Sequence, residues 1–257
     1  MVELQFKKYQ GTGNDFIMID GIRQSLRLNP EQIQHLCHRK LGIGADGVII
    51  LERDDSSDFY VNYYNSDGSQ SFCGNGSRCS VAFSRAVGII SANTCTFRAI
   101  DGMHTGELLA DGTVKVSMGD VSGMEHLSQG KFLNTGSPHV VTQCNALKDL
   151  DIIKAAHDIR YNERFKEKGT NVNFVSEQDG LISIRTYERG VEDETLSCGT
   201  GVTAVALALA EEEGFHLREI KTEGGLLRVA FKKEKSEFTH VFLMGAAQEV
   251  FFGEIQL

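Results

Sequence analysis

Two segments of the chain begin with a CGxG tetrapeptide and continue with apolar residues at helical spacing. The first segment opens at Cys73 and closes at Gly88, with apolar positions at Cys79, Ala82, Phe83, Ala86 and Val87. The second opens at Cys198 and closes at Gly214, with apolar positions at Val202, Val205, Ala206 and Leu209. This spacing predicts a helix after each CGxG motif. Because these helices are the most apolar of the chain, we expect each to be the central helix of a domain.

Strand-like alternation of apolar and polar residues dominates the rest of the chain. Typical runs are residues 59–64 and 181–187. Asp-Gly pairs at 101–102, 111–112 and 179–180 stand between such runs and predict hairpin turns. The predicted fold class is therefore α+β with a mainly antiparallel sheet.

Two further helices are predicted, one in each half of the chain. Asn29 can cap the first helix, Pro30 fits its first turn, and Gly42 is expected to end it. Its inward face is predicted to comprise Ile33, Leu36, Cys37 and Leu41. Its counterpart is expected over residues 149–159, with an inward face of Ile152, Ile153 and Ala156.

These elements form an internal repeat. The cysteines of the two CGxG motifs are 125 residues apart, and Gly13 and Gly136, each in a Thr-Gly pair, are 123 residues apart. Met-Gly pairs at 118–119 and 244–245 are 126 residues apart. The nearly constant offset predicts two pseudo-symmetric domains, each a mainly antiparallel sheet or barrel around a central helix.

The boundary between the two halves is predicted near Val121. The first half then spans residues 1–120 and the second spans residues 121–247. The last strand, expected from about residue 248 to residue 255, could pair with either half on the pattern alone.

Composition narrows the class of protein. With 41% hydrophobic and 24% charged residues, the 257-residue chain is expected to be globular, with two domains. Its net charge of −9 argues against non-specific binding to nucleic acid. The chain has no run of 18 apolar residues, so no transmembrane helix is expected. Segment 1–8 lacks the apolar core of a signal peptide. We therefore expect a cytoplasmic protein with no nucleic-acid or membrane partner.

The chain has six cysteines, and their spacing excludes two common roles. No CxxC pair occurs, and no Cys/His ladder has zinc-finger spacing. We therefore expect reduced thiols and no metal site. Four of the six have no unusual neighbours and are interpreted as structural: Cys37, Cys79, Cys95 and Cys144.

A cysteine at the start of a helix is a candidate for acid–base chemistry. Unpaired N–H groups and a partial positive charge at a helix N-terminus can bind a carboxylate and favour a thiolate. If a pseudo-twofold axis relates the two halves, Cys73 and Cys198 face each other across a cleft. Inversion of a stereocentre needs one group to remove a proton from one face and a second group to deliver a proton to the other. The repeat therefore predicts an amino-acid epimerase that uses two thiols.

Five motifs together resemble the diaminopimelate epimerase family over essentially the whole chain. They are residues 11–16 (GTGNDF), 65–69 (NSDGS), 73–79 (CGNGSRC), 187–190 (YERG) and 198–201 (CGTG). The resemblance implies a fold in which the C-terminal strand, residues 248–257, returns to the first domain. It also implies interconversion of LL- and meso-diaminopimelate, in the bacterial route to lysine and peptidoglycan, without pyridoxal phosphate or metal. The expected partners are a small amino-acid substrate and a second copy of the chain, in a homodimer.

The resemblance also implies roles for individual residues. Cys73 and Cys198 match the catalytic pair. The residues that match the α-carboxylate site at the helix starts are Gly74, Asn75, Gly199 and Thr200. Further matches to substrate contacts are Asn14, Asn65, Asn171 and Arg189, the last three around the distal amino-acid end. Glu188 and His139 match residues beside the reacting centre that orient or tune the thiols. Such a set suits an amino acid, because arginine binds a carboxylate through two hydrogen bonds and asparagine both donates and accepts.

Two departures and three alternatives stay open on the sequence. Ser137 stands where many members of the family carry asparagine, and Gly47 replaces a polar residue of some members. The nearest alternative is an epimerase of the same fold that acts on proline, hydroxyproline or histidine. The others are a thiol redox or metal-binding protein and a non-catalytic amino-acid-binding module.

Overall fold

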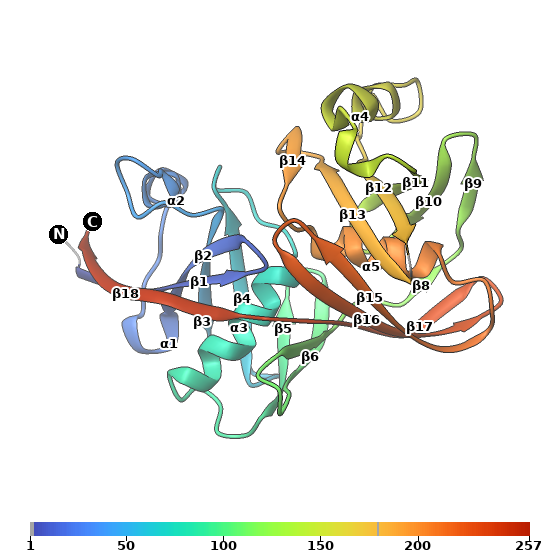
Figure 1. The fold of residues 1–257 in the computed structure, drawn as a ribbon. Helices are drawn as coiled ribbons and strands as arrows, with labels where there is room; N and C mark the ends of the chain where they lie inside the picture. The colour runs from blue at the N-terminus through green and yellow to red at the C-terminus, as the bar shows by residue number, and fades with distance from the viewer. Residues whose placement is uncertain (1–2, 179) are drawn as a thin grey trace. The chain divides into compact units, whose positions relative to one another are not determined.

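The computed structural model describes residues 3–178 and 180–257 and divides the chain into two compact units. Unit 1 comprises Met1–Val116 and Met244–Leu257, and unit 2 comprises Ser117–Leu243 (Figure 1). The sequence prediction placed these two divisions after residues 120 and 247, whereas the structure places them after residues 116 and 243. Because unit 1 includes Met244–Leu257, it contains the C-terminal strand. No helix among the described residues has both the length and the apolar character that a membrane span requires.

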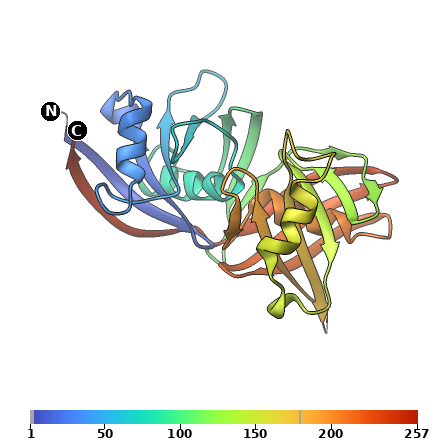
Figure 2. The same ribbon diagram turned by 90° about the horizontal axis from the view of Figure 1, so that it is seen from above.

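Unit 1 is built from a curved sheet and three helices. Its strands are β1 (Glu3–Gly11), β2 (Asn14–Asp20), β3 (Gly47–Glu52), β4 (Phe59–Asn65), β5 (Thr94–Ala99), β6 (Gly102–Leu108), β7 (Val114–Ser117) and β18 (Gln248–Gln256). Its helices are α1 (Gly21–Gln24), α2 (Pro30–Cys37) and α3 (Gly74–Ala86). Helix α3 packs against β1 and β2 (Figures 1 and 2).

Unit 2 repeats this plan. Its strands are β8 (Val121–Ser122), β9 (Glu125–Leu127), β10 (Gly130–Asn134), β11 (Pro138–Gln143), β12 (Asn171–Gln178), β13 (Leu181–Glu188), β14 (Asp193–Thr195), β15 (Gly214–Thr222), β16 (Gly225–Glu234) and β17 (Glu237–Gly245). Its helices are the 3-10 helix η1 (Leu147–Asp149), α4 (Ile152–Arg160) and α5 (Gly199–Ala208).

The repeat is visible in the strand pairing of the two units. In unit 1, β1–β2, β3–β4 and β5–β6 are antiparallel, whereas β2–β3 and β4–β5 are parallel. In unit 2, β10–β11, β12–β13 and β15–β16 are antiparallel, whereas β11–β12 and β13–β15 are parallel. A parallel pair needs a long crossover connection. In both units the first crossover carries a surface helix, α2 or α4, and the second carries the CGxG helix, α3 or α5. The predicted fold class, α+β with a mainly antiparallel sheet in two similar halves, is confirmed.

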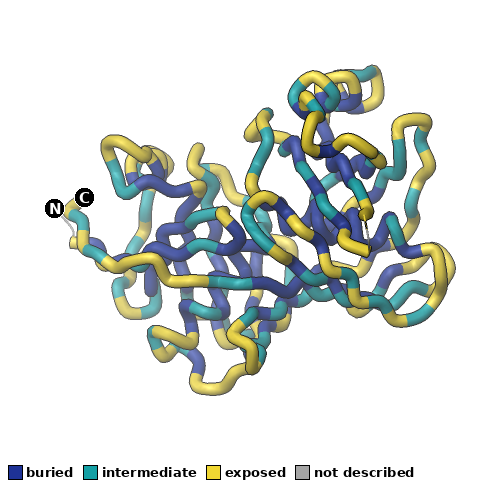
Figure 3. Tube along the Cα trace, viewed as in Figure 1, coloured by how far each residue is buried: buried dark blue, intermediate teal, exposed yellow. Residues whose placement is uncertain are grey.

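The CGxG helices form the centre of each unit. All of the residues of α5 are buried, and of the 13 residues of α3 the buried ones are Gly74 to Val81, Phe83 and Ser84. Figure 3 shows this burial along the central helices and strands, with exposed residues at the loops. Because a fully buried apolar helix needs cover on every face, α5 is surrounded by strands of its unit, among them β10, β11, β12 and β16. Ala86, one of the apolar positions at helical spacing, is exposed at the end of α3, and α5 ends at Ala208, before the predicted end at Gly214.

The first surface helix begins as predicted and ends earlier. Asn29 caps α2, and its side chain and that of Gln32 form a reciprocal capping box. The helix ends at Cys37, so the prediction that it reaches Gly42 with Leu41 inward is wrong: Leu41 is 72% exposed. The cause is a tight return of the chain, in which the N–H groups of Ile43 and Gly44 bond the carbonyl of Leu36. In unit 2, the counterpart helix α4 is capped by Asp151 and buries Ile152 and Ala156, while Ile153 is partly buried.

The hairpin and C-terminal strand predictions have clear outcomes. Ile100 and Asp101 link β5 to β6, where Ala99 pairs with Gly102, and residues 111–112 turn between β6 and β7. Of the third predicted turn, residue 179 lies outside the described residues. Strand β18 pairs antiparallel with β1 from Glu3↔Gln256 to Gln10↔Gln248, so the last strand belongs to unit 1, as the family resemblance implied.

Candidate active site

The two cysteines occupy the same position in their units. Cys73 is the N-cap residue of α3, and Cys198 is the N-cap residue of α5. Both have extended backbone, with φ −137° and ψ 111° at Cys73 and φ −117° and ψ 110° at Cys198. The Sγ of Cys73 accepts the Gly76 N–H at 3.4 Å. Each sulfur therefore lies beside a helix N-terminus, where backbone N–H groups and the helix dipole favour negative charge.

The second glycine of each CGxG motif is required by close packing. A Cβ at Gly76 would lie 2.9 Å from Ile49 Cδ1, and a Cβ at Gly201 would lie 2.6 Å from Asn173 Oδ1 and 3.3 Å from the Cβ of Cys198. These contacts are too short for any larger residue without a shift of the neighbours. The glycines thus let the surrounding side chains approach the helix start directly behind each cysteine.

Asn14 and Asn75 lie beside Cys73 in unit 1. The thiol of Cys73 donates to Asn14 Oδ1 at a sulfur–oxygen distance of 3.6 Å, and Asn75 Nδ2 donates to the same oxygen at 3.3 Å. Asn65, also in unit 1, donates through Nδ2 to the hydroxyls of Ser69 and Ser71 at the end of β4. The structure therefore groups Cys73, Asn14 and Asn75, and places Asn65 on a neighbouring turn that its own side chain stabilises.

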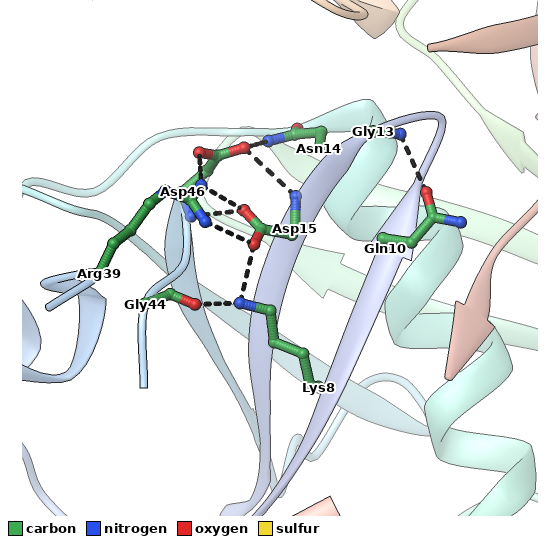
Figure 4. Close-up of polar contacts among 8 residues, drawn as sticks. All are labelled: Lys8, Gln10, Gly13, Asn14, Asp15, Arg39, Gly44 and Asp46. Atoms are coloured by element: carbon green, nitrogen blue, oxygen red, sulfur yellow. Dashed lines mark hydrogen bonds and ion pairs between the residues drawn. The ribbon is translucent and has the colours of Figure 1, made fainter. Parts of the chain in front are cut away.

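Behind Asn14 lies a network of charged side chains (Figure 4). Asn14 Nδ2 donates to Asp46 Oδ2 at 2.7 Å, and Asp46 and Asp15 are both ion-paired with Arg39. The buried ammonium of Lys8 pairs with Asp15 at 2.8 Å and also bonds the carbonyl of Gly44. Burial alone would raise the pKa of Asp15, but hydrogen bonds from Arg39 and Lys8 outweigh it and lower the pKa to about 2. Asp15 is thus a stable anion, and the network gives Asn14 a rigid support.

Thr200 and His139 lie beside Cys198 in unit 2. The Sγ of Cys198 is 3.4 Å from Thr200 Oγ1, and that hydroxyl is 2.9 Å from His139 Nε2. The backbone carbonyl of Thr200 accepts the hydroxyl of Thr135 at 2.8 Å. The hydroxyl of Thr200 therefore connects the sulfur to a buried imidazole.

The protonation of His139 follows from its neighbours. Asn173 Oδ1 accepts the Thr186 hydroxyl at 3.1 Å, so Asn173 Nδ2 points at His139 Nδ1, 3.1 Å away, and at the Val140 carbonyl. Nδ1 is then an acceptor, and the proton of the neutral ring resides on Nε2, which donates to Thr200. Burial, with the charge of Arg189, lowers the pKa of His139 to about 3. His139 is therefore a neutral hydrogen-bond donor to Thr200 at physiological pH.

The distal residues of unit 2 form a second group. Asn171 Oδ1 accepts the Arg189 N–H at 2.9 Å, and its Nδ2 donates to Ser137 Oγ at 3.0 Å and to the Pro138 carbonyl at 2.9 Å. The exposed guanidinium of Arg189 bonds the carbonyl of Lys168 at 3.0 Å and Ser137 Oγ at 3.4 Å. The buried side chain of Asn171 thus fixes the backbone N–H of Arg189. The hydroxyl of Ser137 contacts the side chains of both residues.

Glu188 is the last residue of β13 and is partly buried, and Arg189 follows it in the turn after the strand. Its Oε2 accepts the hydroxyl of Thr195 at 2.9 Å. Glu188 bonds Thr195, whereas the side chain of Arg189 bonds Lys168 and Ser137. A carboxylate and a guanidinium therefore stand side by side at one end of β13.

Sequence reasoning missed three residues of these groups. Asp46 orients Asn14, Asn173 orients His139, and Arg78, fully buried on α3, donates to Asn75 Oδ1 at 2.9 Å. Arg78 could have been found, because it lies in the quoted CGNGSRC motif. Asp46 and Asn173 carried no local signal, since each meets its partner only through strand pairing.

Of the remaining cysteines, Cys37, Cys79 and Cys95 are buried and Cys144 is partly buried. No disulfide joins any of the cysteines that the structure describes. Burial raises the pKa of the thiols of Cys37, Cys79 and Cys95 to about 12, so these side chains stay protonated. Within residues 3–178 and 180–257, no group of three or more His, Cys, Asp or Glu side chains is placed to hold a metal ion.

The low pKa of His139 predicts a pH-dependent stability. The unfolded chain takes up a proton at this histidine below its ordinary pKa of 6.5, while the folded chain does not until pH falls to about 3. Unfolding is therefore favoured as pH falls below 6.5, and this group should cost about 1 kcal/mol of stability per pH unit in that range. Urea denaturation at several pH values should show the slope, and His139→Asn should reduce it. His126→Asn, at an exposed histidine of the same unit, is the control and should leave the slope unchanged.

Comparison with known proteins finds a matching family model and relatives that cover nearly the whole chain. The family model described as diaminopimelate epimerase matches residues 6–124 and 131–250. A protein named diaminopimelate epimerase from Flavobacterium psychrophilum is 47% identical over 253 residues, which cover 96% of this chain and 98% of that protein. One of the same name from Chlorobaculum tepidum is 39% identical over 259 residues, covering 96% and 99%.

Solved structures share the fold at low sequence identity. A phenazine biosynthesis protein of the PhzF family from Bacillus anthracis superposes with a TM-score of 0.78 at 12% identity and covers both chains completely. A hydroxyproline epimerase from Agrobacterium vitis superposes with a TM-score of 0.70 at 13% identity, over 99% of this chain and 93% of that one. At such identities the similarity concerns the fold alone.

Proposed function

We propose that this chain, which belongs to the diaminopimelate epimerase family and is an isomerase, interconverts LL- and meso-2,6-diaminopimelate in the synthesis of lysine and peptidoglycan. The observation that carries the proposal is the pair of N-cap cysteines, Cys73 and Cys198, on the equivalent central helices of two repeated units. A single helix-start cysteine would suit many thiol functions. A matched pair suits a reaction that has the same chemistry on two faces of one carbon.

The proposed mechanism uses the two thiols as acid and base, without a cofactor. In one direction a thiolate removes the proton from Cα and becomes a thiol, and the electron pair stays on the substrate as a carbanion. The other thiol then delivers its proton to the opposite face of Cα and becomes a thiolate. The reverse reaction exchanges the two roles. Removal of a weakly acidic Cα proton needs fixed dipoles that stabilise the developing charge, and two helix N-termini would supply them.

The proposed α-carboxylate site lies at these helix starts. Gly74, Asn75, Gly199 and Thr200 are the first residues of α3 and α5, and a helix leaves its first N–H groups without an intrahelical acceptor. At Cys198 the hydroxyl of Thr200, which accepts a hydrogen bond from His139 Nε2–H, is placed to donate to the sulfur. This donor would stabilise the thiolate form of Cys198 during turnover.

Arg189 supports diaminopimelate over substrates that carry one carboxylate. Its guanidinium is exposed while its backbone is tied to Asn171 and its side chain to Lys168 and Ser137. A guanidinium held in this way can bind a second carboxylate through two hydrogen bonds. Proline, hydroxyproline and histidine have no such group to offer.

The test is exchange of the α-proton in deuterated water. The purified protein is incubated with LL-diaminopimelate, and NMR follows loss of the α-proton signal while chiral chromatography follows the meso isomer. We expect deuterium at Cα and an approach to the equilibrium mixture. L-proline, trans-4-hydroxy-L-proline and L-histidine are run in parallel. Exchange on one of these, with none on diaminopimelate, would contradict the proposal.

A further inference from the structure

Two charged residues end a line of side-chain amides beside Cys73. At one end is Arg78, which is 0% exposed and donates to Asn75 Oδ1 at 2.9 Å, to Thr12 Oγ1 at 3.2 Å and to the Ala246 carbonyl at 3.4 Å. At the other end is Asp46, which accepts from Asn14 Nδ2 at 2.7 Å. Asn75 and Asn14 form the line between them. Cys73, the two asparagines and the two charged residues all belong to unit 1.

The two charges fix the orientation of both amides. A guanidinium has only donors, so Asn75 must turn its Oδ1 toward Arg78 and its Nδ2 toward Asn14. An ionised carboxylate has only acceptors, so Asn14 must turn its Nδ2 toward Asp46 and its Oδ1 inward. The inward Oδ1 accepts from Asn75 Nδ2 at 3.3 Å and from the thiol of Cys73 at 3.6 Å. The dipoles of the two amides therefore run head to tail from the cation to the anion.

Asp46 is itself held firmly. Its Oδ1 pairs with Arg39 at 2.7 Å, and its Oδ2 accepts the backbone N–H of Asp15 at 3.2 Å as well as Asn14 (Figure 4). Arg39 also binds Asp15, which Lys8 neutralises from the buried side. The carboxylate that faces Asn14 is therefore held by Arg39 and by the backbone of Asp15.

We propose that Arg78 and Asp46 are positioning residues for Cys73, because together they orient Asn75 and Asn14 so that an acceptor, Asn14 Oδ1, faces the sulfur. A thiol can donate to this oxygen, whereas a thiolate would face its lone pairs. The contact therefore favours the protonated form of Cys73 and aims its S–H bond at a defined atom. Other groups act in the opposite sense: the Gly76 N–H and the charge of Arg78 favour the thiolate. Burial lowers the pKa of Arg78 to about 10, which leaves it cationic near neutral pH.

The two half-sites are then unequal. Cys73 faces an amide oxygen that cannot donate, whereas Cys198 faces the hydroxyl of Thr200, which can. The importance of this difference for catalysis rests on the proposed function, in which one cysteine must start as a thiol and the other as a thiolate. The amide orientation itself rests only on the contacts of unit 1.

The pH dependence of alkylation tests the orientation directly. Substrate-free protein is treated with iodoacetamide between pH 5 and 10, and peptide mass spectrometry follows Cys73 and Cys198 separately, because only the thiolate reacts. In Asp46→Ala the Nδ2 of Asn14 loses its acceptor, so the amide is no longer anchored and can move its Oδ1 away from the sulfur. We expect the apparent pKa of Cys73 to fall by about half to one unit, the worth of one hydrogen bond. Cys198 should keep its profile.

A second variant and a control keep the result interpretable. Asn14→Ala removes the acceptor itself and should move the apparent pKa of Cys73 in the same direction. Glu107→Ala removes a carboxylate of similar exposure from another ion pair of unit 1, that with Lys115, and should change neither cysteine. An unchanged Cys73 profile in folded Asp46→Ala, or equal shifts at both cysteines, would overturn the proposal. Since alkylation needs no turnover, a wild-type protein without epimerase activity would refute the proposed function and leave this test intact.

Discussion

Replacement of either Cys73 or Cys198 by alanine is expected to lower the rate of diaminopimelate epimerisation by about 1,000-fold or more. The reason is that inversion needs a proton carrier on each face of Cα. The two thiols act in one reaction and not in two parallel ones, so the loss of either stops inversion. Both side chains lie at helix N-caps, where alanine can be accommodated without an overpacked core. The measurement is the initial rate of meso-diaminopimelate formation from the LL isomer, by chiral chromatography.

The matched control is Cys144→Ala. Cys144 is a partly buried cysteine of unit 2 that packs against the core cluster containing Leu147 and Phe174, and its replacement should leave the rate unchanged. Deuterium exchange adds a second readout, since a variant with one remaining thiol can still exchange the α-proton on the face that this thiol serves. Full epimerase activity in either single variant would refute the two-thiol mechanism.

The local parts of the fold could be predicted from the sequence. The N-cap cysteines, the Asn29 capping box and the spacing of apolar residues on α3 and α5 all depend on residues within one or two turns of each other. Leu41 shows the limit of such reasoning. It continues the apolar spacing of α2, but hydrogen bonds from Ile43 and Gly44 to the Leu36 carbonyl turn the chain away first.

The supporting residues of the site depend on strand register, which local patterns do not specify. In unit 1 the parallel pairing of Phe16 with Gly47 brings Asp46 beside Asn14. In unit 2 the parallel pairing of Val141 with Asn173 brings that asparagine beside His139. The same parallel step of the repeat thus supplies the support for each cysteine, with an anion behind Asn14 in one unit and a neutral amide behind His139 in the other. A repeat detected in the sequence predicts that such supports exist, but the register decides which residues they are.

Replacement of Arg189 by methionine is expected to raise the KM for diaminopimelate roughly 10- to 100-fold, the usual effect of losing a charge-assisted, bidentate hydrogen bond. Methionine keeps much of the length of the side chain and removes the donors. The backbone N–H of residue 189 would still bond Asn171 Oδ1, so the end of β13 should keep its conformation. The value of kcat should fall as well if the distal carboxylate helps to align Cα with the thiols.

Arg164→Met separates this effect from a general loss of charge. Arg164 is an arginine of the same unit that forms a surface ion pair with Glu125 at 2.6 Å, and its replacement should leave KM unchanged. A substrate that lacks the distal carboxylate gives the sharper comparison, because it should be turned over equally poorly by wild type and Arg189→Met. If Arg189→Met kept the wild-type KM for diaminopimelate, the distal carboxylate would have to bind elsewhere. The preference for a substrate with two carboxylates would then need a different explanation from the exposed guanidinium that Ser137 and Lys168 hold in place.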